Sequence, residues 1–255
     1  MRMPRLLAGY VRRYFLEVMA WRSFLVTLVV NQSVTPIIGL AVWSAALPGS
    51  TIVTTYYVAL LAVQLMTVSY EHHTFSNGIY AGDLSAELLK PRPVVLTTLG
   101  VNAALRIWHV LVGLPLIVLA GLVADVSFNT GPVLLAIPAV ALAAAIRFLF
   151  TYVLALSAFW TERAHGVVGL GETLIFLLGA AAAPITLFPE GIRPLGEALP
   201  FRAMLGFPAE IASGSLSEMQ VLEGYGWQAC WMAALAISAV LVWRSGVRRY
   251  TAVGG

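Results

Sequence analysis

VLLAIPAVALAAAIRFLFTYVLALSAF, residues 133–159, is the stretch that decides the fold of this chain. Arg147 is its one charged residue. An α-helix rises ~1.5 Å per residue, so about 20 apolar residues cross the ~30 Å hydrocarbon core of a bilayer. The stretch therefore predicts a membrane-spanning helix.

The composition of the whole chain agrees with a membrane environment. Of 255 residues, 60% are hydrophobic and 11% are charged, against roughly 25% charged in soluble globular proteins. The net charge of +3 comes from basic residues scattered beside apolar blocks, without the basic patch and interleaved aromatics that bind nucleic acid. Cys230 is the single cysteine, which excludes an intrachain disulfide and a zinc site built from cysteines.

Five further apolar blocks accompany residues 133–159, and the six predict an all-α membrane protein with six transmembrane helices. They form a single transmembrane domain over residues 1–255. The first block follows five arginines, as in a secretory signal, but it is longer than a signal core and five spans follow it. We interpret it as a retained span, the alternative being cleavage after residues 44–46. The five blocks cover residues 23–46, 52–70, 103–124, 166–187 and 226–243.

Residues 3–22 precede the first span and have an amphipathic pattern. Leu6, Tyr10, Tyr14 and Val18 recur every four residues. The row beside them is also apolar, and the charged residues fall largely elsewhere. This pattern predicts an interfacial helix that lies in the headgroup plane. The alternative is a plain extension of the first span.

Lysine and arginine orient the predicted spans. Eleven lie in segments on the side of both termini, and two, Arg193 and Arg202, lie in loops on the other side. Because cytoplasmic loops are enriched in basic residues, both termini are predicted to be cytoplasmic, with the protein in the cell (inner) membrane.

Two loops are long enough to hold structure of their own. In the cytoplasmic loop 71–102, Asp83 or Ser85 is a candidate cap for a short helix through Leu89, which prolines then stop. The outer loop 188–225 has apolar stretches too short to cross the membrane, which predicts short re-entrant helices between spans five and six.

Several charged residues lie within the predicted spans, where each costs at least ~2.5 kcal/mol. From the helical rise, Arg147 lies ~20 Å and Glu172 ~9 Å from the inner end, so a direct salt bridge requires the fifth helix to begin before residue 166. We expect Arg147 to face a subunit interface or a watery cavity and Glu172 to lie near the inner mouth of a pathway. Structural anchoring is the alternative. Arg106 and His109 are expected to snorkel out at the cytoplasmic end of the third span.

The sequence lacks the usual catalytic motifs. Lys90 is the single lysine and is followed by Pro91, so the Gly-Lys-Ser/Thr end of a Walker phosphate loop is missing. This chain is therefore not expected to hydrolyse ATP alone. Glu71, His72 and His73 are adjacent and cannot share one helix face, which disfavours a metal site.

The layout resembles the ABC type-2 exporter permeases over nearly the whole chain. GDLSAELLKP, residues 82–91, is similar to the Gly, acidic turn and Leu-Leu-basic-Pro ending that this family has after its second span. Residues 188–208 resemble its outer region between the fifth and sixth spans. The tail WRSGVRRY, residues 243–250, resembles its basic, aromatic ending.

The resemblance implies a transporter of two permeases, this chain and a second copy or a homologous permease, with two separate ATPase subunits. ATP and Mg²⁺ would be bound by the ATPases, with no cofactor in this chain. Closure of the ATPase pair would push on a coupling helix at 78–89 and on the interfacial helix 3–22. The implied coupling residues are Gly78, Ile79, Tyr80, Gly82, Asp83, Leu84, Glu87 and Leu88. The implied outer gate is Phe188, Pro189, Pro200 and Phe201.

Arg147, Glu172 and Arg106 are the candidate polar residues of the pathway. The substrate stays open, since members of this family move drugs, peptides, lipids or glycans. Two other classes remain as alternatives. A membrane enzyme or assembly factor would use the Glu71-His72-His73 cluster, and an ion-driven secondary transporter would show inverted repeats between its halves.

Overall fold

The computed structural model describes residues 3–161 and 164–250, with the side chains of 72–74 and 164–165 left aside. Throughout this part of the chain the regular elements are helices, which confirms the all-α prediction. In chain order they are α1 (Met3–Met19), α2 (Arg22–Ala46), α3 (Thr51–Thr67), α4 (Glu71–Tyr80), α5 (Asp83–Leu88), α6 (Val95–Val123), α7 (Thr130–Ala155), η1 (Leu156–Phe159), α8 (Ala164–Leu178), η2 (Ile185–Leu187), α9 (Arg193–Ala198), α10 (Pro200–Met204), α11 (Gly206–Ala212) and α12 (Glu218–Val247).

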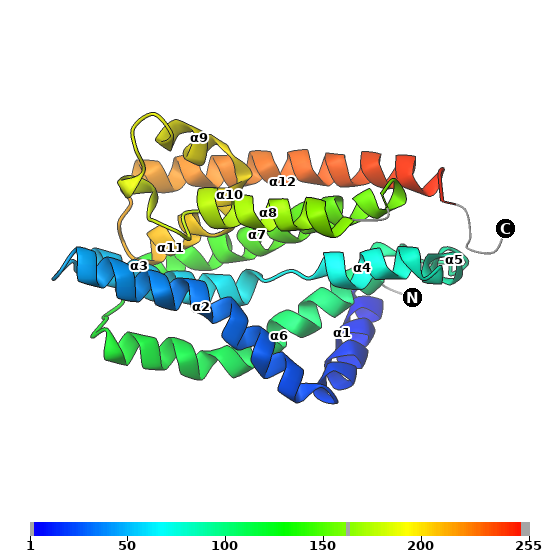
Figure 1. The fold of residues 1–255 in the computed structure, drawn as a ribbon, viewed down its shortest axis with the longest axis horizontal. Helices are drawn as coiled ribbons and strands as arrows, with labels where there is room; N and C mark the ends of the chain where they lie inside the picture. The colour runs from blue at the N-terminus through cyan, green and yellow to red at the C-terminus, as the bar shows by residue number, and fades with distance from the viewer. Residues whose placement is uncertain (1–2, 162–163, 251–255) are drawn as a thin grey trace.

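Four helices are long and apolar enough to cross a bilayer: α2, α6, α7 with η1, and α12. Each matches a predicted span, although α6 and α12 both begin eight residues earlier than predicted. A capping box between Ser217 and Gln220 explains the early start of α12. The other two predicted spans correspond to the shorter apolar helices α3 and α8. Figure 1 shows these helices running along the long axis of the molecule.

The short helix α3 lies at the centre of the bundle. Most of its side chains are buried, and Tyr57 and Leu65 are fully enclosed. Its main neighbours are α2, α6, α7 and α11. By contrast α2 leaves most of its apolar side chains exposed, and α6 fully buries few of its own, as expected of helices that contact lipid. Helix α3 therefore sits in a protein environment, and its 17 residues make it shorter than its neighbours α2, α6 and α7.

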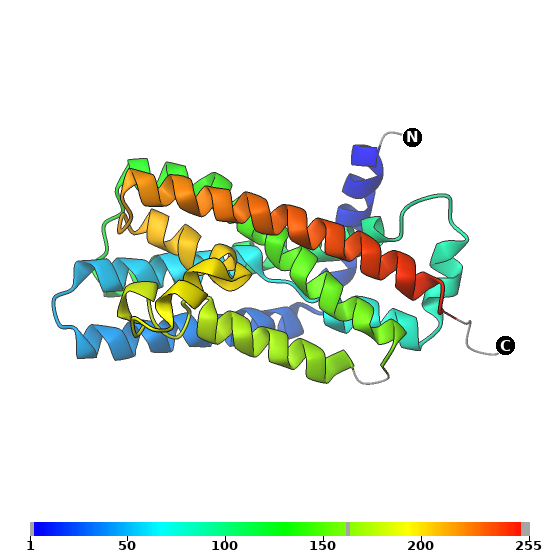
Figure 2. The same cartoon turned by 90° about the horizontal axis from the view of Figure 1, so that it is seen from above.

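Helix α1 lies steeply across the end of the bundle that also holds α4, α5 and the end of α12 (Figures 1 and 2). Its predicted apolar rows are half-buried against α6, where Phe15 stacks on Trp108 at 5.0 Å. Gly100 lets the helices meet, since a Cβ there would lie 2.5 Å from the Cβ of Tyr10. Its arginines are exposed. Helix α1 thus packs its apolar face on the bundle and turns its charges outward.

The predicted coupling segment is a helical hairpin. Helix α4 continues the direction of α3 after a short extended link (Figure 1), and Gly82 turns the chain into α5 with φ +81°, a backbone conformation that favours glycine. The expected cap at Asp83 or Ser85 is wrong. Gly82 occupies the cap position of α5, with no side-chain hydrogen bond there.

The predicted fifth span ends early. Helix α8 stops at Leu178 rather than at residue 187, and η2 and the short helices α9, α10 and α11 follow. Helix α11 is almost wholly buried against α3 and α7. Short helices were expected in this region from the apolar stretches 192–199 and 207–212, and α9 lies within the first while α11 covers the second.

Candidate functional site

A break between α3 and α4 lies inside the bundle and leaves helix-terminal carbonyls in need of donors. Arg106 of α6 supplies them. Its Nε donates to the Val68 carbonyl at 2.8 Å, and its Nη2 donates to the Thr67 carbonyl at 3.3 Å and to Ser69 Oγ at 2.9 Å. The same nitrogen also donates to the Ala144 carbonyl of α7 at 2.7 Å. One guanidinium therefore caps α3 and joins it to α6 and α7.

The other side of the break is held by a carboxylate. Glu71 is the first residue of α4 and is 1% exposed. It accepts hydrogen bonds from Asn102 of α6 and from Thr151 Oγ1 of α7, the latter at 2.6 Å. Burial raises the pKa of Glu71 to about 7, against the opposing effects of its hydrogen bonds and of Arg106. Glu71 and Arg106 are thus the two charged groups that hold the interrupted helix.

A chain of polar side chains extends from the break toward α2. Arg147 Nη1 donates to Gln64 Oε1 and to Thr67 Oγ1, both at 3.1 Å. Gln64 in turn donates to Gln32 of α2 at 2.6 Å. Hydrogen bonds also link Gln32 to the Tyr70 hydroxyl, and this hydroxyl to His109 Nε2 at 3.1 Å. These contacts join α2, α3, α6 and α7 into one intramembrane network.

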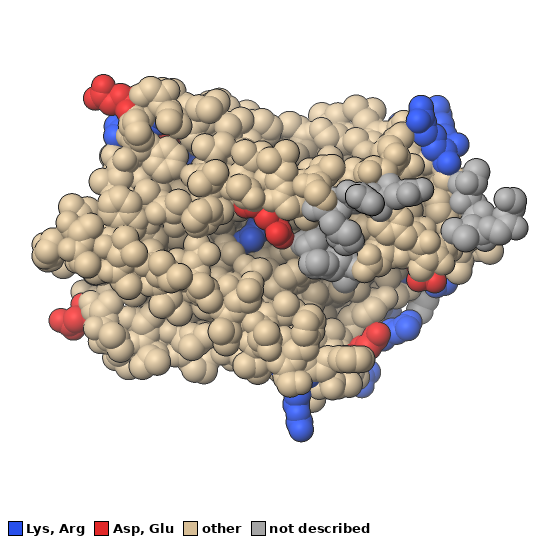
Figure 3. Space-filling model, in the orientation of Figure 1, with Lys and Arg blue, Asp and Glu red and all other residues tan. Residues whose placement is uncertain are grey.

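The intramembrane charges differ in part from expectation. His109 is fully buried, and Arg106 is held by internal carbonyls, so the prediction that both snorkel outward is wrong. Arg147 is 7% exposed, while Glu172 on α8 is exposed and lies within electrostatic reach of it. Figure 3 shows the face of the molecule drawn in Figure 1, and near its middle lies a hollow in which basic and acidic side chains are visible.

The predicted coupling residues fall into two groups. Ile79 and Leu84 are buried in a cluster with residues of α7 and α12. Leu88 is 40% exposed, and Leu89, which lies in the predicted coupling helix 78–89 but not among its named residues, is 88% exposed. A six-residue helix is too short for periodicity to separate its faces, so the exposed end of α5 was not identifiable from the sequence.

Polar contacts tie the hairpin and the segment after it to their surroundings. Ser85 Oγ and the Tyr250 hydroxyl of the tail are 3.1 Å apart, and the Tyr80 hydroxyl donates to the Thr161 carbonyl at 3.0 Å. Glu87 forms ion pairs with Lys90 and Arg92. Although burial acts to raise it, these partners lower the pKa of Glu87. The Arg92 guanidinium lies 4.4 Å from the centre of the Tyr10 ring of α1.

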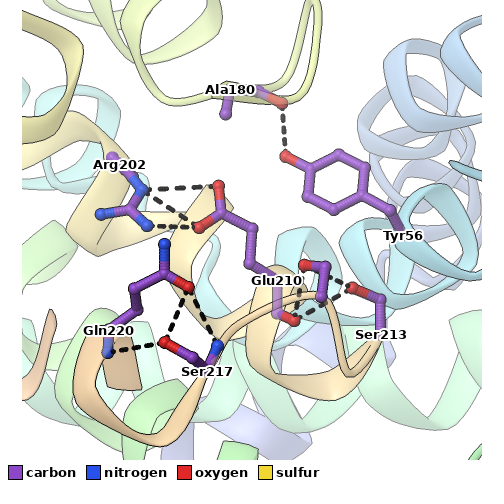
Figure 4. A network of polar contacts seen from close by, with 8 residues as sticks. Tyr56, Ala180, Arg202, Glu210, Ser213, Ser217 and Gln220 are labelled. Carbon is purple, nitrogen blue, oxygen red and sulfur yellow. Dashed lines mark hydrogen bonds and ion pairs between the residues drawn. The ribbon is translucent and has the colours of Figure 1, made fainter. Parts of the chain in front are cut away.

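The predicted outer-gate residues separate in a similar way. Pro200 and Phe201 are buried, whereas Phe188 is half-buried and Pro189 is exposed. Sequence reasoning missed the donors that end α8. The Tyr56 hydroxyl donates to the Ala180 carbonyl at 2.6 Å (Figure 4), and the Ala182 carbonyl accepts from Tyr57 and Trp43.

An ion pair lies beside these carbonyls. Arg202 of α10 and Glu210 of α11 face each other in Figure 4, with Nη2 and Oε2 2.6 Å apart. Their side chains are 13% and 4% exposed. The pair closes the short hairpin formed by α10 and α11.

A family model described as ABC-2 family transporter protein matches residues 18–254. The chain belongs to this family. No curated protein and no solved structure matches it. Membership supports an ABC-2 type permease, a multi-pass transport protein of the membrane. No group of three or more His, Cys, Asp or Glu able to bind a metal occurs among the residues described for this ABC-2 protein. The side chains of His72 and His73 lie outside those residues.

Proposed function

We propose that this ABC-2 protein is the transmembrane subunit of an ATP-driven exporter. It forms the substrate pathway as a dimer, either with itself or with a homologous permease, and two separate ATPase subunits drive it. ATP and Mg²⁺ belong to those ATPases. The single lysine, Lys90, is followed by Pro91, which supports hydrolysis in another chain.

The observation that carries the proposal is the α4–α5 hairpin. The end of α5 presents two adjacent exposed leucines, Leu88 and Leu89, an apolar spot that fits a contact with a partner protein. The turn between α4 and α5 is anchored, because Ile79 and Leu84 on either side of it pack against α7 and α12. A force applied to the end of α5 therefore reaches the bundle through packed side chains.

The distribution of charge supports a cytoplasmic position for this hairpin. Basic side chains of α1, of the α5–α6 segment and of the end of α12 all lie at the hairpin end of the molecule (Figure 3). Arg193 and Arg202 are the basic residues of the segments around α9 and α10, which lie at the opposite end (Figure 1). By the positive-inside rule the hairpin end faces the cytoplasm, with α2, α3, α6, α7, α8 and α12 as the six crossings.

The polar network supplies a route from the hairpin to the pathway. Glu71 begins α4, and its partners on α6 and α7 lead through Arg106 to the end of α3. Movement of α4 thus changes the hydrogen bonds that hold α3. At the other end, Phe201 and the α10–α11 hairpin form the outer gate.

The test is co-purification with and without the exposed leucine. We expect the tagged protein, isolated from its native cells, to carry a protein with Walker motifs, identified by mass spectrometry. Leu89→Asp should remove this partner, because a carboxylate at an apolar contact costs several kcal/mol. Leu84→Asp is unsuitable, since Leu84 is 3% exposed and its replacement would test folding.

Leu195→Asp is the matched control. Leu195 is 53% exposed on α9, at the opposite end of the molecule, so this variant should retain the partner. The proposed function is refuted if wild-type protein carries no Walker-motif partner, or if Leu89→Asp and Leu195→Asp retain it equally while both remain folded.

A further inference from the structure

A cavity of about 960 Å³ lies between α1, the start of α2, the α4–α5 hairpin and α6. This volume lies at the upper end of the ~300–1,000 Å³ range of small-molecule sites. Its walls are mainly aliphatic and aromatic, with the rings of Tyr14, Phe24, Tyr70 and Phe75 among them. A large apolar ligand with a group that packs on aromatic ring faces fits such walls.

The charged residues of the lining are all acidic. They are Glu17 of α1 and Asp83 and Glu87 of α5, and no lysine or arginine belongs to the lining among the described residues. Glu87 is already neutralised by Lys90 and Arg92. Within the described part of the chain, Glu17 and Asp83 have no basic side chain at ion-pair distance. The cavity thus has two exposed carboxylates that form no ion pair within the described residues, while the guanidinium of Arg13 lies 5.6 Å from the centre of the Tyr14 ring.

The carboxylates and the aromatic walls act on the same space. Burial raises the pKa of the Tyr14 hydroxyl, Arg13 opposes this, and Glu17 and Glu87 add to it. The negative charges of two different helices therefore both reach this ring. Carboxylates together with ring faces are the chemistry that binds an organic cation.

We propose that this cavity binds a lipophilic organic cation, with its charge between Glu17 and Asp83 and its apolar body against the aromatic walls. The identification of such cations as the cargo of the transporter rests on the proposed function, whereas binding does not. Tyr70 lines the inner part of the cavity and contacts His109 and Gln32. An occupant therefore touches the network at the α3–α4 break.

An anionic phospholipid is a poorer occupant of the same space. Its phosphate would meet the two carboxylates without a basic partner in the lining, and like charges repel. A neutral acyl chain would fill the apolar walls but leave Glu17 and Asp83 without a partner. The charge of the lining therefore selects the cation.

The experiment compares two ions of the same shape and opposite charge. The purified full-length protein is placed in phosphatidylcholine nanodiscs without ATPase partners, and binding of tetraphenylphosphonium and tetraphenylborate is measured by equilibrium dialysis against empty nanodiscs. We expect saturable binding of the phosphonium and none of the borate above the empty-disc level.

Two variants locate the site. Glu17→Gln with Asp83→Asn should weaken phosphonium binding about fivefold to tenfold, the size expected for two exposed charge contacts. Val101→Trp places an indole in the cavity and should abolish binding. The control, Glu190→Gln with Glu223→Gln, makes the same change of charge at exposed positions outside the lining and should leave binding unchanged. Unfolding temperatures establish that all three variants are folded.

Each outcome decides the proposal. Equal binding of both ions, absence of phosphonium binding, or retention of wild-type affinity in the Glu17 and Asp83 variant overturns it. Retention of binding by folded Val101→Trp overturns the location. Because no ATPase is present, a failure here leaves the co-purification result unaffected. Conversely, loss of the ATPase partner leaves cation binding intact.

Discussion

Two apolar helices of the bundle, α3 and α8, end inside it, and the two interruptions are held by different chemistry. At the α3–α4 break the carbonyls of Thr67 and Val68, at the end of α3, are bound by the guanidinium of Arg106, and Glu71 lies at the start of α4. At the end of α8 the carbonyls of Ala180 and Ala182 are bound by the neutral donors Tyr56, Tyr57 and Trp43.

The difference shows which interruption can respond to a signal. A charged group in a low-dielectric site interacts strongly with every neighbouring dipole, so a small displacement changes its energy substantially. The α3–α4 break has such groups and leads directly into the α4–α5 hairpin. The end of α8 is held by neutral hydrogen bonds and by a nearby ion pair whose charges cancel locally. We infer that the α3–α4 break transmits movement and that the α10–α11 hairpin behaves as a rigid unit.

Arg106→Met should have the largest effect. It removes the donor for three carbonyls and a hydroxyl on three elements, and unpaired buried groups cost ~1–3 kcal/mol each. We expect a loss of about 5 kcal/mol in stability, measured by tryptophan fluorescence during thermal unfolding in detergent. Arg193→Met is the control, because Arg193 donates to carbonyls of an outer loop. Equal losses in the two variants would contradict the difference between the two regions.

Arg202→Met comes next. It leaves the Glu210 carboxylate, 4% exposed, without its partner, and a broken buried pair costs ~3–5 kcal/mol. We expect about 3 kcal/mol, since one edge of the pair reaches solvent. The double variant Arg202→Met with Glu210→Leu should recover most of this loss. If the double variant is as unstable as the single one, the pair contributes more than mutual neutralisation.

The sequence predicted the helices but not their interruptions. The family and the all-helical fold follow from the apolar blocks and from the segment 82–91, whereas the coupling role of residues 78–89 stays a prediction. The break after Thr67 has no proline or glycine to signal it, and Val68 continues the apolar pattern. What ends α8 is a set of donors on α2 and α3, more than 120 residues away in the chain. Such partners become visible only once the chain has folded.

The pH dependence of stability should report the charge at the α3–α4 break. The pKa of Glu71 is about 7 in the folded protein, against the ordinary value of 4.5 for a glutamate side chain. A raised pKa means that the folded state binds the proton more tightly than the unfolded chain does. The protonated carboxyl therefore stabilises the fold below pH 4.5, and this stabilisation is lost as pH rises through 7. We expect wild-type protein to lose about 2 kcal/mol between pH 5 and pH 8.

Glu71→Gln is the matching variant. Glutamine has a similar size and keeps one oxygen acceptor, but it does not titrate. The unfolding temperature of this variant should therefore change much less between pH 5 and pH 8. The carboxylate faces Arg106, which stays charged throughout. Parallel pH profiles for the two proteins would exclude Glu71 as the titrating group.

Tyr56→Phe should have the smallest measurable effect, and a neighbouring tyrosine makes it a sharp test of the region after α8. The Ala180 carbonyl accepts from Tyr56, and Ala180 itself has φ +61°, a conformation that costs ~1–2 kcal/mol for a non-glycine residue. Loss of this donor should lower stability by about 1 kcal/mol. Tyr57→Phe removes a similar hydroxyl, but the Ala182 carbonyl keeps the Trp43 indole as a donor at 3.0 Å. Its unfolding temperature should therefore match that of the wild type. If Tyr57→Phe is instead the more damaging change, the hydrogen bonds to the Ala180 and Ala182 carbonyls after α8 do not contribute as the structure indicates. The stability of this region would then depend on packing of the tyrosine rings rather than on their hydroxyl groups.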